Sequence, residues 1–359
     1  MRLALLAVLS FSACPAPSMN DAGVSDPFDQ PGPFPVGVTT LSTTTDAGRT
    51  LNVEVWYPTV ESARAASEAG FATEEFESDA ARRSQLAMWI SQAPEKCTPR
   101  RAFGARDAEF ASGSRGLLVF SHCTECFRFS MHSVAERLAS QGWIIAAPDH
   151  LQNTRFDGTA PISNAFLATR ASDISGVIDL MVSSSRFTVD AQRIAVFGHS
   201  FGAVTTGKVV EQDARVRAGL LFAAPVDSPF LNSGAAPRVM KPLSWVLAME
   251  DNSISYLGNG FIRDNFTHVP KPNWLVEVEN AGHWTFSDIA GLGGDYLPGC
   301  GDGKRDPDGG AFTYLDNDDG RRIAQRTAAA WAKFVLDGDE AAGTALSVER
   351  DGITHVKRR

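Results

Sequence analysis

Short apolar runs and amphipathic stretches alternate through the middle and the C-terminal half of the chain. The apolar runs predict buried strands at Leu117–Ser121, Trp143–Ala147, Arg193–Phe197, Ala218–Phe222, Leu243–Met249 and Trp274–Val278. Stretches with helical spacing predict helices at Met131–Ser140, Arg170–Ser184, Phe201–Glu211 and Arg321–Leu336. Strands and helices in this order form a mostly parallel sheet with helices on both faces. The sequence therefore predicts an α/β fold.

Two β-branched segments precede this alternation. Val36–Thr43 and Thr50–Tyr57 flank a short polar stretch, which is typical of a β-hairpin. Residues 60–115 combine helical spacing with polar stretches, so we expect an insertion or cap within a catalytic domain that spans 36–338. The charged residues 339–359 are expected to form a C-terminal tail.

The first residues have the pattern of an export signal. Arg2 is followed by a short apolar stretch and small residues up to Ala13, too few to span a bilayer, which predicts a signal peptide at residues 1–13. Cys14 follows directly, and this favours lipidation of Cys14 after cleavage; simple secretion or a periplasmic location is the alternative. Residues 14–35 are rich in Pro, Ser, Asp and Gly and predict a flexible tether. We therefore expect an exported protein at the outer membrane or cell surface.

Composition excludes one class of partner. The chain has 33 Lys and Arg residues against 42 Asp and Glu residues, a net charge of −9. A nucleic-acid binder needs a cationic face to release counterions from phosphates, and none is present here. We expect a monomer that meets a membrane only through the lipid anchor.

Cleavage before Cys14 leaves four cysteines besides Cys14 in the mature chain. An even number of cysteines in an exported chain favours two disulfides, whose pairing the sequence leaves open. These cysteines are Cys97, Cys123, Cys126 and Cys300.

A nucleophile motif follows the third predicted parallel strand. Gly198-His199-Ser200-Phe201-Gly202 comes directly after an apolar run and begins a helical stretch. At such a strand-to-helix turn, G-x-S-x-G lifts a serine hydroxyl above the sheet edge. Ser200 is therefore the candidate nucleophile.

A serine needs a base, and the base needs an orienting acid. In this topology the acid and then the histidine follow the serine in the chain. His283 lies just beyond the last predicted core strand and is favoured over His268 and His355. Asp251, at the end of the preceding strand, is the favoured acid. Asp227 and Glu250 stay open as alternatives.

An acyl-transfer site also needs two N–H donors for the oxyanion. We expect one from Phe201, the residue after the nucleophile, and the other from Thr124 in the loop after strand Leu117–Ser121.

These residues together resemble serine esterases of the α/β-hydrolase fold, in the group of platelet-activating-factor acetylhydrolases, dienelactone-hydrolase-like proteins and cutinase-type polyester hydrolases. The matching segments are 53–58, 118–122, 138–142, 147–150, 193–202 and 281–283. The resemblance implies hydrolysis of carboxylic esters without a cofactor, with Ser200 as nucleophile, His283 as base and Asp251 as acid, and with Phe201 and Thr124 as oxyanion donors. In two places the chain departs from the family. Cys123 stands where a glycine is usual, and Ala223 stands where the acetylhydrolases take their acid.

Other functions remain as alternatives. Cys123-Thr124-Glu125-Cys126 lies between a strand and a helix, as in thiol-disulfide exchange sites. Zinc at His122, Cys123, Cys126 and His132 has an unusual spacing. The aspartates of the loop Asp295–Asp319 do not match a known calcium-loop spacing, which favours a solvated loop. A surface lipoprotein of hydrolase fold that only binds its ligand is a further alternative.

Overall fold

The computed structural model describes residues 26–45, 48–97, 101–229, 238–293, 296–297, 299–350 and 352–359. The predicted signal peptide, Cys14 and the first part of the tether up to residue 25 lie outside these ranges. Within them, no helix has both the length and the apolar character needed to cross a bilayer.

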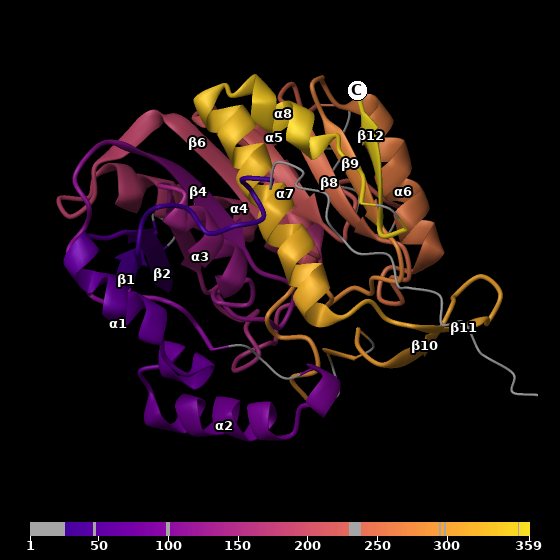
Figure 1. Cartoon of the computed structure of the whole chain (residues 1–359), viewed down its shortest axis with the longest axis horizontal. Helices are drawn as coiled ribbons and strands as arrows, with labels where there is room; N and C mark the ends of the chain where they lie inside the picture. The colour runs from indigo at the N-terminus through magenta and orange to yellow at the C-terminus, as the bar shows by residue number, and fades with distance from the viewer. Residues whose placement is uncertain are drawn as a thin grey trace, which may run out of the picture.

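Ten strands form one central sheet (Figure 1). They are β1 (Val36–Thr44), β2 (Thr50–Pro58), β3 (Ala105–Arg106), β4 (Arg115–Ser121), β5 (Ile144–Pro148), β6 (Val189–His199), β7 (Val216–Phe222), β8 (Leu243–Ala248), β9 (Trp274–Val278) and β12 (Thr354–Arg358). The spatial order is β12-β9-β8-β7-β6-β4-β5-β2-β1-β3. Strands β5, β4, β6, β7, β8 and β9 are parallel, and the β1–β2 hairpin pairs antiparallel with β5. The predicted α/β fold with an N-terminal hairpin is confirmed.

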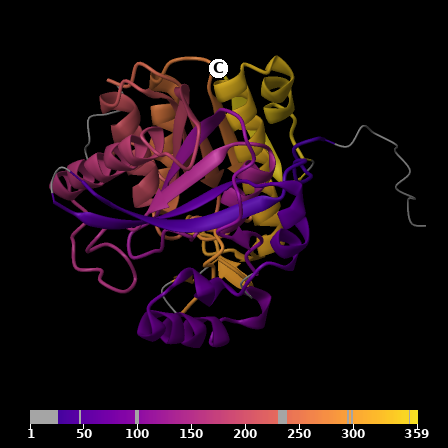
Figure 2. The same cartoon turned by 90° about the vertical axis from the view of Figure 1, so that its left-hand side faces the viewer.

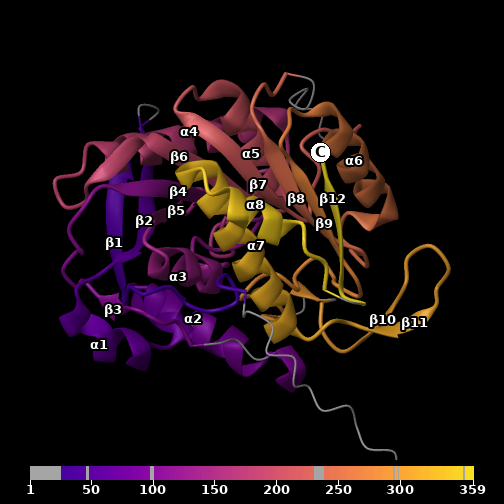
Figure 3. The same ribbon diagram turned by 45° about the horizontal axis from the view of Figure 1, so that its top comes forward.

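Helices cover both faces of the sheet, as Figures 2 and 3 show. One face carries α3 (His132–Ser140), α7 (Asn317–Asp337) and α8 (Glu340–Leu346); the other carries α4 (Asn164–Val182), α5 (Phe201–Gln212) and α6 (Ser255–His268). Strand side chains alternate between the two cores, since Leu118 and Phe120 join the α3–α7 core and Leu117 and Val119 the α4–α5 core. Burial on both faces explains why the central strands are continuous apolar runs in the sequence.

The C-terminal segment differs from the predicted tail. Residues 339–359 form α8 and β12, and β12 pairs antiparallel with β9 at the edge of the sheet. Lys357 and Arg358 place charge on this edge strand, which is a common way to block edge-to-edge association. The same charges concealed the strand from the hydrophobic pattern.

The described part of the predicted tether, residues 26–35, packs onto the domain. Phe28 is buried in the α3–α7 core, Asp26 pairs with Arg326 at 2.6 Å, and Asp29 pairs with Arg350. The flexible tether expected from composition therefore does not extend through these residues.

The insertion at 60–115 contains α1 (Arg64–Ala69), α2 (Ala80–Ser91), three short 3₁₀ turns and β3. Cys97 lies in the third 3₁₀ turn of the insertion. Its disulfide with Cys300 joins the insertion to the loop that follows His283 in the chain. Figures 1 and 2 show α2 at the same end of the molecule as the small hairpin of β10 (Asp302–Lys304) and β11 (Ala311–Thr313). The insertion is thus fixed to the C-terminal half of the domain.

Candidate active site

Ser200 sits at a strained turn between β6 and α5. Its φ is 57° and its ψ −123°, a conformation that costs energy for any residue with a Cβ. Its backbone N–H donates to the carbonyl of Phe222 at 2.9 Å. Gly198 and Gly202 are both required, because a Cβ at either one would clash with backbone of Gly202 or of Ser121. The turn matches the nucleophile elbow that the motif predicts.

Strand register brings the predicted oxyanion donors to the same place. Ser121 at the end of β4 pairs with Gly198 of the adjacent parallel β6, so the loop after β4 lies beside the elbow. This loop contains Thr124, and Phe201 is the first residue of α5. Within the described ranges, neither backbone amide donates to a protein acceptor. The oxyanion role of these two amides stays a prediction.

His283 and Asp251 form a buried pair. His283 Nδ1 lies 2.7 Å from Asp251 Oδ2, and both side chains are almost fully buried. The other oxygen of Asp251 accepts from the backbone N–H groups of Ser253 and Ile254 at 2.9 and 3.0 Å. The carboxylate is thus held from three sides with one oxygen directed at the imidazole.

Of the two alternative acids, Glu250 has another partner, and Asp227 is anchored through its backbone. Glu250 forms an ion pair with Arg305, and the backbone N–H of Asp227 donates to Asn265 Oδ1 at 2.9 Å. Among the described residues, Asp251 is the carboxylate in contact with His283.

His199 connects the nucleophile turn to the histidine loop. Its Nε2 donates to the carbonyl of His283 at 2.7 Å, and the two rings lie 4.9 Å apart. Burial lowers the pKa of His199 to about 3, with the nearby His283 acting in the same direction. A neutral His199 therefore fixes the His283 backbone next to Ser200.

The structure places Ser200 and His283 at the same sheet edge. Among the described residues, no hydrogen bond joins their two side chains. Such bonds are often long in ligand-free sites.

Disulfides account for all four candidate cysteines. Cys123 pairs with Cys126 and Cys97 with Cys300. The Cys123–Cys126 bridge closes around Thr124, and both of its cysteines are fully buried. This arrangement constrains the oxyanion loop, and it leaves little access for the partner thiol that an exchange reaction requires.

A second Ser–His–Asp group, which the sequence patterns did not reveal, lies beneath this loop. Ser121 Oγ is 3.0 Å from His150 Nε2, and His150 Nδ1 is 2.9 Å from Asp173 Oδ2. All three are buried, and Arg49 forms a salt bridge with Asp173 at 2.9 Å. Burial, together with the charges of Arg170 and Arg49, holds the pKa of His150 well below its usual range. We call Ser121, His150 and Asp173 the buried triad.

The neutral state of His150 fixes the direction of the hydrogen bonds. Its Nδ1–H donates to Asp173, so its Nε2 accepts from Ser121. The backbone N–H of His150 donates to His122 Nε2 at 3.0 Å, and His122 Nδ1–H then donates to the carbonyl of Cys123 at 2.6 Å. Burial likewise holds the pKa of His122 well below its usual range. The buried triad thus connects directly to the oxyanion loop.

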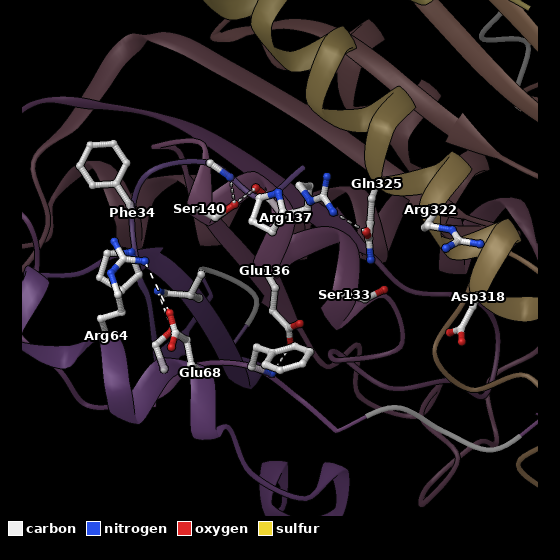
Figure 4. Close-up of a pocket in the computed structure, with 16 residues that line it drawn as sticks. Phe34, Arg64, Glu68, Ser133, Glu136, Arg137, Ser140, Asp318, Arg322 and Gln325 are labelled. Carbon is white, nitrogen blue, oxygen red and sulfur yellow. Dashed lines mark hydrogen bonds and ion pairs between the residues drawn. The ribbon is translucent and has the colours of Figure 1, made fainter. Parts of the chain in front are cut away.

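A cavity of about 490 Å³ lies elsewhere in the molecule, between the N-terminal segment, α1, α3 and α7 (Figure 4). Phe34, Arg64, Glu136 and Arg322 are among its lining residues, and it includes none of the predicted site residues.

The Gly/Asp-rich loop around Cys300 forms the β10–β11 hairpin. Asp306 accepts from the backbone N–H of Tyr256 at 3.2 Å, and Asp316 caps the N-terminus of α7 by accepting from Asp318 N–H at 2.8 Å. Over the described ranges, no group of three or more His, Cys, Asp or Glu side chains is arranged to hold a metal ion.

Comparison with known proteins supports the fold and the resemblance. The family model "Platelet-activating factor acetylhydrolase, isoform II" matches residues 25–156. Platelet-activating factor acetylhydrolase of Bos taurus is 24% identical to this chain over 222 residues, which cover 48% of each chain. That of Canis lupus familiaris is 24% identical over 178 residues, which cover 36% of this chain and 39% of the relative. The chain spans at most about half the length of these curated relatives.

A solved structure extends the likeness over almost the whole chain. Ferulic acid esterase from Streptomyces cinnamoneus superposes with a TM-score of 0.68 at 22% identity, covering 90% of this chain and 96% of the other. The predicted resemblance to the acetylhydrolase group and the predicted α/β-hydrolase fold are confirmed.

Proposed function

We propose that this chain is a serine carboxylic-ester hydrolase with Ser200, His283 and Asp251 as its catalytic triad. One observation carries the proposal: a serine on a strained strand-to-helix turn shares a sheet edge with a buried histidine–carboxylate pair. The likeness to an acetylhydrolase family and to an esterase structure supports the same reaction class.

The geometry suggests the order of events. His283 Nε2 takes the proton of Ser200 as Oγ attacks the ester carbonyl carbon, while Asp251 holds the Nδ1–H and stabilises the imidazolium. The amides of Phe201 and Thr124 donate to the tetrahedral oxyanion. The C–O bond to the alcohol then breaks, and the alcohol leaves with the proton from His283. Water, deprotonated by His283, hydrolyses the acyl-enzyme and releases the carboxylic acid with Ser200 restored.

For the substrate, we propose short-acyl esters of small molecules, lipids or polyesters. The relatives are acetylhydrolases by name, which favours a small acyl group, and the structural neighbour is by name an esterase for an aromatic acid. Trp284 lies 4.6 Å from the His283 ring, and Tyr296 lies 5.0 Å from Trp284. These rings pack beside the base, and we propose that they contact the acyl group.

The test is a series of p-nitrophenyl esters from acetate to palmitate, with methyl ferulate added, on the wild type and on Ser200→Ala. We expect Ser200-dependent hydrolysis that favours acetate and butyrate, with polyester film as the next substrate. A preference for palmitate would instead indicate a lipase with residues 61–116 as its lid, and a preference for ferulate an aromatic-acid esterase. Absence of hydrolysis on every ester would contradict the proposed function and favour a binding or redox role.

We also propose export with a lipid anchor at Cys14, which lies outside the described residues. Cys14→Ser is expected to move the protein from the membrane fraction to the soluble exported fraction. An unchanged distribution would favour simple secretion.

A further inference from the structure

We propose that Arg170 is a positioning residue that holds the two halves of the oxyanion hole in register. Arg170 lies on α4, is fully buried, and touches neither Ser200 nor the His283–Asp251 pair. This inference rests on the proposed function, because the oxyanion hole has a role only in acyl transfer.

One side of the guanidinium holds the oxyanion loop. Its Nη2 donates to the carbonyl of His122 and, at 3.1 Å, to Ser121 Oγ. Its Nη1 donates to Asn153 Oδ1, and the carbonyl of Asn153 accepts from the backbone N–H of Glu125 at 3.0 Å. Arg170 thus holds the backbone on both sides of Thr124: directly at His122, two residues before it, and through Asn153 at Glu125, the residue after it.

The other side of the guanidinium holds the first turn of α5. Its Nε donates to Thr205 Oγ1 at 3.1 Å, and that hydroxyl donates to the carbonyl of Phe201 at 2.9 Å. The guanidinium carbon also lies 4.7 Å from the centre of the Phe201 ring. The arginine therefore contacts the residue that supplies the second oxyanion donor.

The choice of arginine argues for positioning rather than for stability alone. A buried charge is costly unless it is paired. Asp173 offsets part of this cost through its nearby negative charge but forms no salt bridge with Arg170 in the described ranges, and the hydrogen bonds of Arg170 go to neutral oxygens. Arginine presents five donors in a planar fork, which a lysine cannot reproduce. The fork reaches three separate segments: the loop after β4, the loop after β5 and α5.

The test compares Arg170→Lys with a matched control, Arg326→Lys. Arg326 is also buried and binds Asp26 and the carbonyl of Ala345, away from the oxyanion elements. For a p-nitrophenyl ester we expect Arg170→Lys to lower kcat about 100-fold with KM changed less than about threefold, because an error of about 1 Å in placement has an effect of this size. Affinity for a trifluoromethyl ketone, which forms a tetrahedral adduct, should fall in parallel with kcat/KM. Arg326→Lys should keep kcat and inhibitor affinity near wild-type values.

Three results would overturn the proposal: kcat of Arg170→Lys equal to that of Arg326→Lys, a loss confined to KM, or unchanged inhibitor affinity. If Arg170→Lys does not fold, Thr205→Val replaces it, since this near-isosteric change removes the contact to α5; the expected loss is on the order of tenfold in kcat with KM unchanged. An unchanged kcat in a folded Thr205→Val would then refute the role. Failure of the proposed function is distinguishable, because it would appear before any Arg170 variant is made, either as a wild type that hydrolyses no ester or as hydrolysis that Ser200→Ala does not remove.

Discussion

The protein contains two Ser–His–Asp groups that differ in what surrounds them. In the group at the sheet edge, Ser200 occupies a strained turn and is partly exposed, while His283 Nδ1 is bound to Asp251 and both of these side chains are buried. In the buried triad, Ser121 continues a regular strand, both nitrogens of His150 are occupied, and every side chain is buried.

A serine, a histidine and an aspartate at hydrogen-bonding distance are not sufficient for acyl transfer. A general base must accept a proton, but burial and two arginines keep His150 neutral, and Arg170 donates to the Ser121 hydroxyl that would have to become a nucleophile. The edge group instead has a strained, partly exposed serine beside two amides that donate to no protein acceptor in the described ranges. We propose that these two features separate the catalytic triad from the buried one.

The largest expected effect separates the two serines. Ser200→Ala should lower kcat by about 10⁴-fold or more, because it removes the nucleophile. Ser121→Ala should keep kcat within about tenfold and cost about 1–3 kcal/mol of stability, because it leaves His150 Nε2 without its donor. Steady-state kinetics and urea unfolding of both variants test this. A larger kcat loss in Ser121→Ala than in Ser200→Ala would reverse the assignment.

The next effect concerns the acids. Asp251→Asn should lower kcat by about 10⁴-fold, since the orientation and charge that support His283 are lost. The matched change Asp227→Asn should stay within about threefold, because Asp251 is the carboxylate in contact with His283. The opposite ranking would move the acid to the end of β7.

In the buried triad, replacing the aspartate by asparagine should lower the free energy of unfolding rather than kcat. Asp173→Asn leaves Arg49 and His150 without their carboxylate, and we expect a loss of about 3 kcal/mol in the free energy of unfolding. Denaturant unfolding measures it, with Asp190→Asn at a partly exposed surface salt bridge as the control, for which at most about 1 kcal/mol is expected. Equal losses of unfolding free energy in the two variants would show that the buried triad stabilises the fold no more than a surface salt bridge does.

The smallest effect is the pH response of His150. Its folded pKa is depressed by burial, Arg170 and Arg49, and Asp173, which also faces it, has a pKa raised by its own burial. Below about pH 6.5 the unfolded state takes up a proton that the folded state does not, so His150 destabilises the fold by about 1.4 kcal/mol per pH unit as pH falls. NMR of the histidine ring protons should show no titration of His150 between pH 8 and 5. A His150 signal that titrates near pH 6.5 would contradict this.

The hydrophobic pattern predicted the parallel strands closely, because burial on both faces gives continuous apolar runs. It missed α6, where Gly258, Gly260 and the buried Asn259 interrupt the apolar spacing. It also missed β12, whose charges suit an edge strand. Both elements depend on tertiary packing rather than on local preference.

The site also has residues that the sequence pattern predicted and residues that only tertiary packing brings together. Ser200, Asp251 and His283 follow strand ends, and the serine motif together with their order in the chain predicted one site; of this site, the structure contains the contact between Asp251 and His283. The buried face of α4 is apolar except for Arg170 and Asp173, three residues apart, and this was the available signal. Its partners come from separate loops and from α5, and no local spacing brings those segments together.

The most direct test is to react the protein with a fluorophosphonate and to locate the adduct by peptide mass spectrometry. Our account predicts one adduct on Ser200, with Ser121 unmodified and with labelling lost in Ser200→Ala. An unlabelled protein, or an adduct on another serine, would contradict the assignment of Ser200 as the nucleophile.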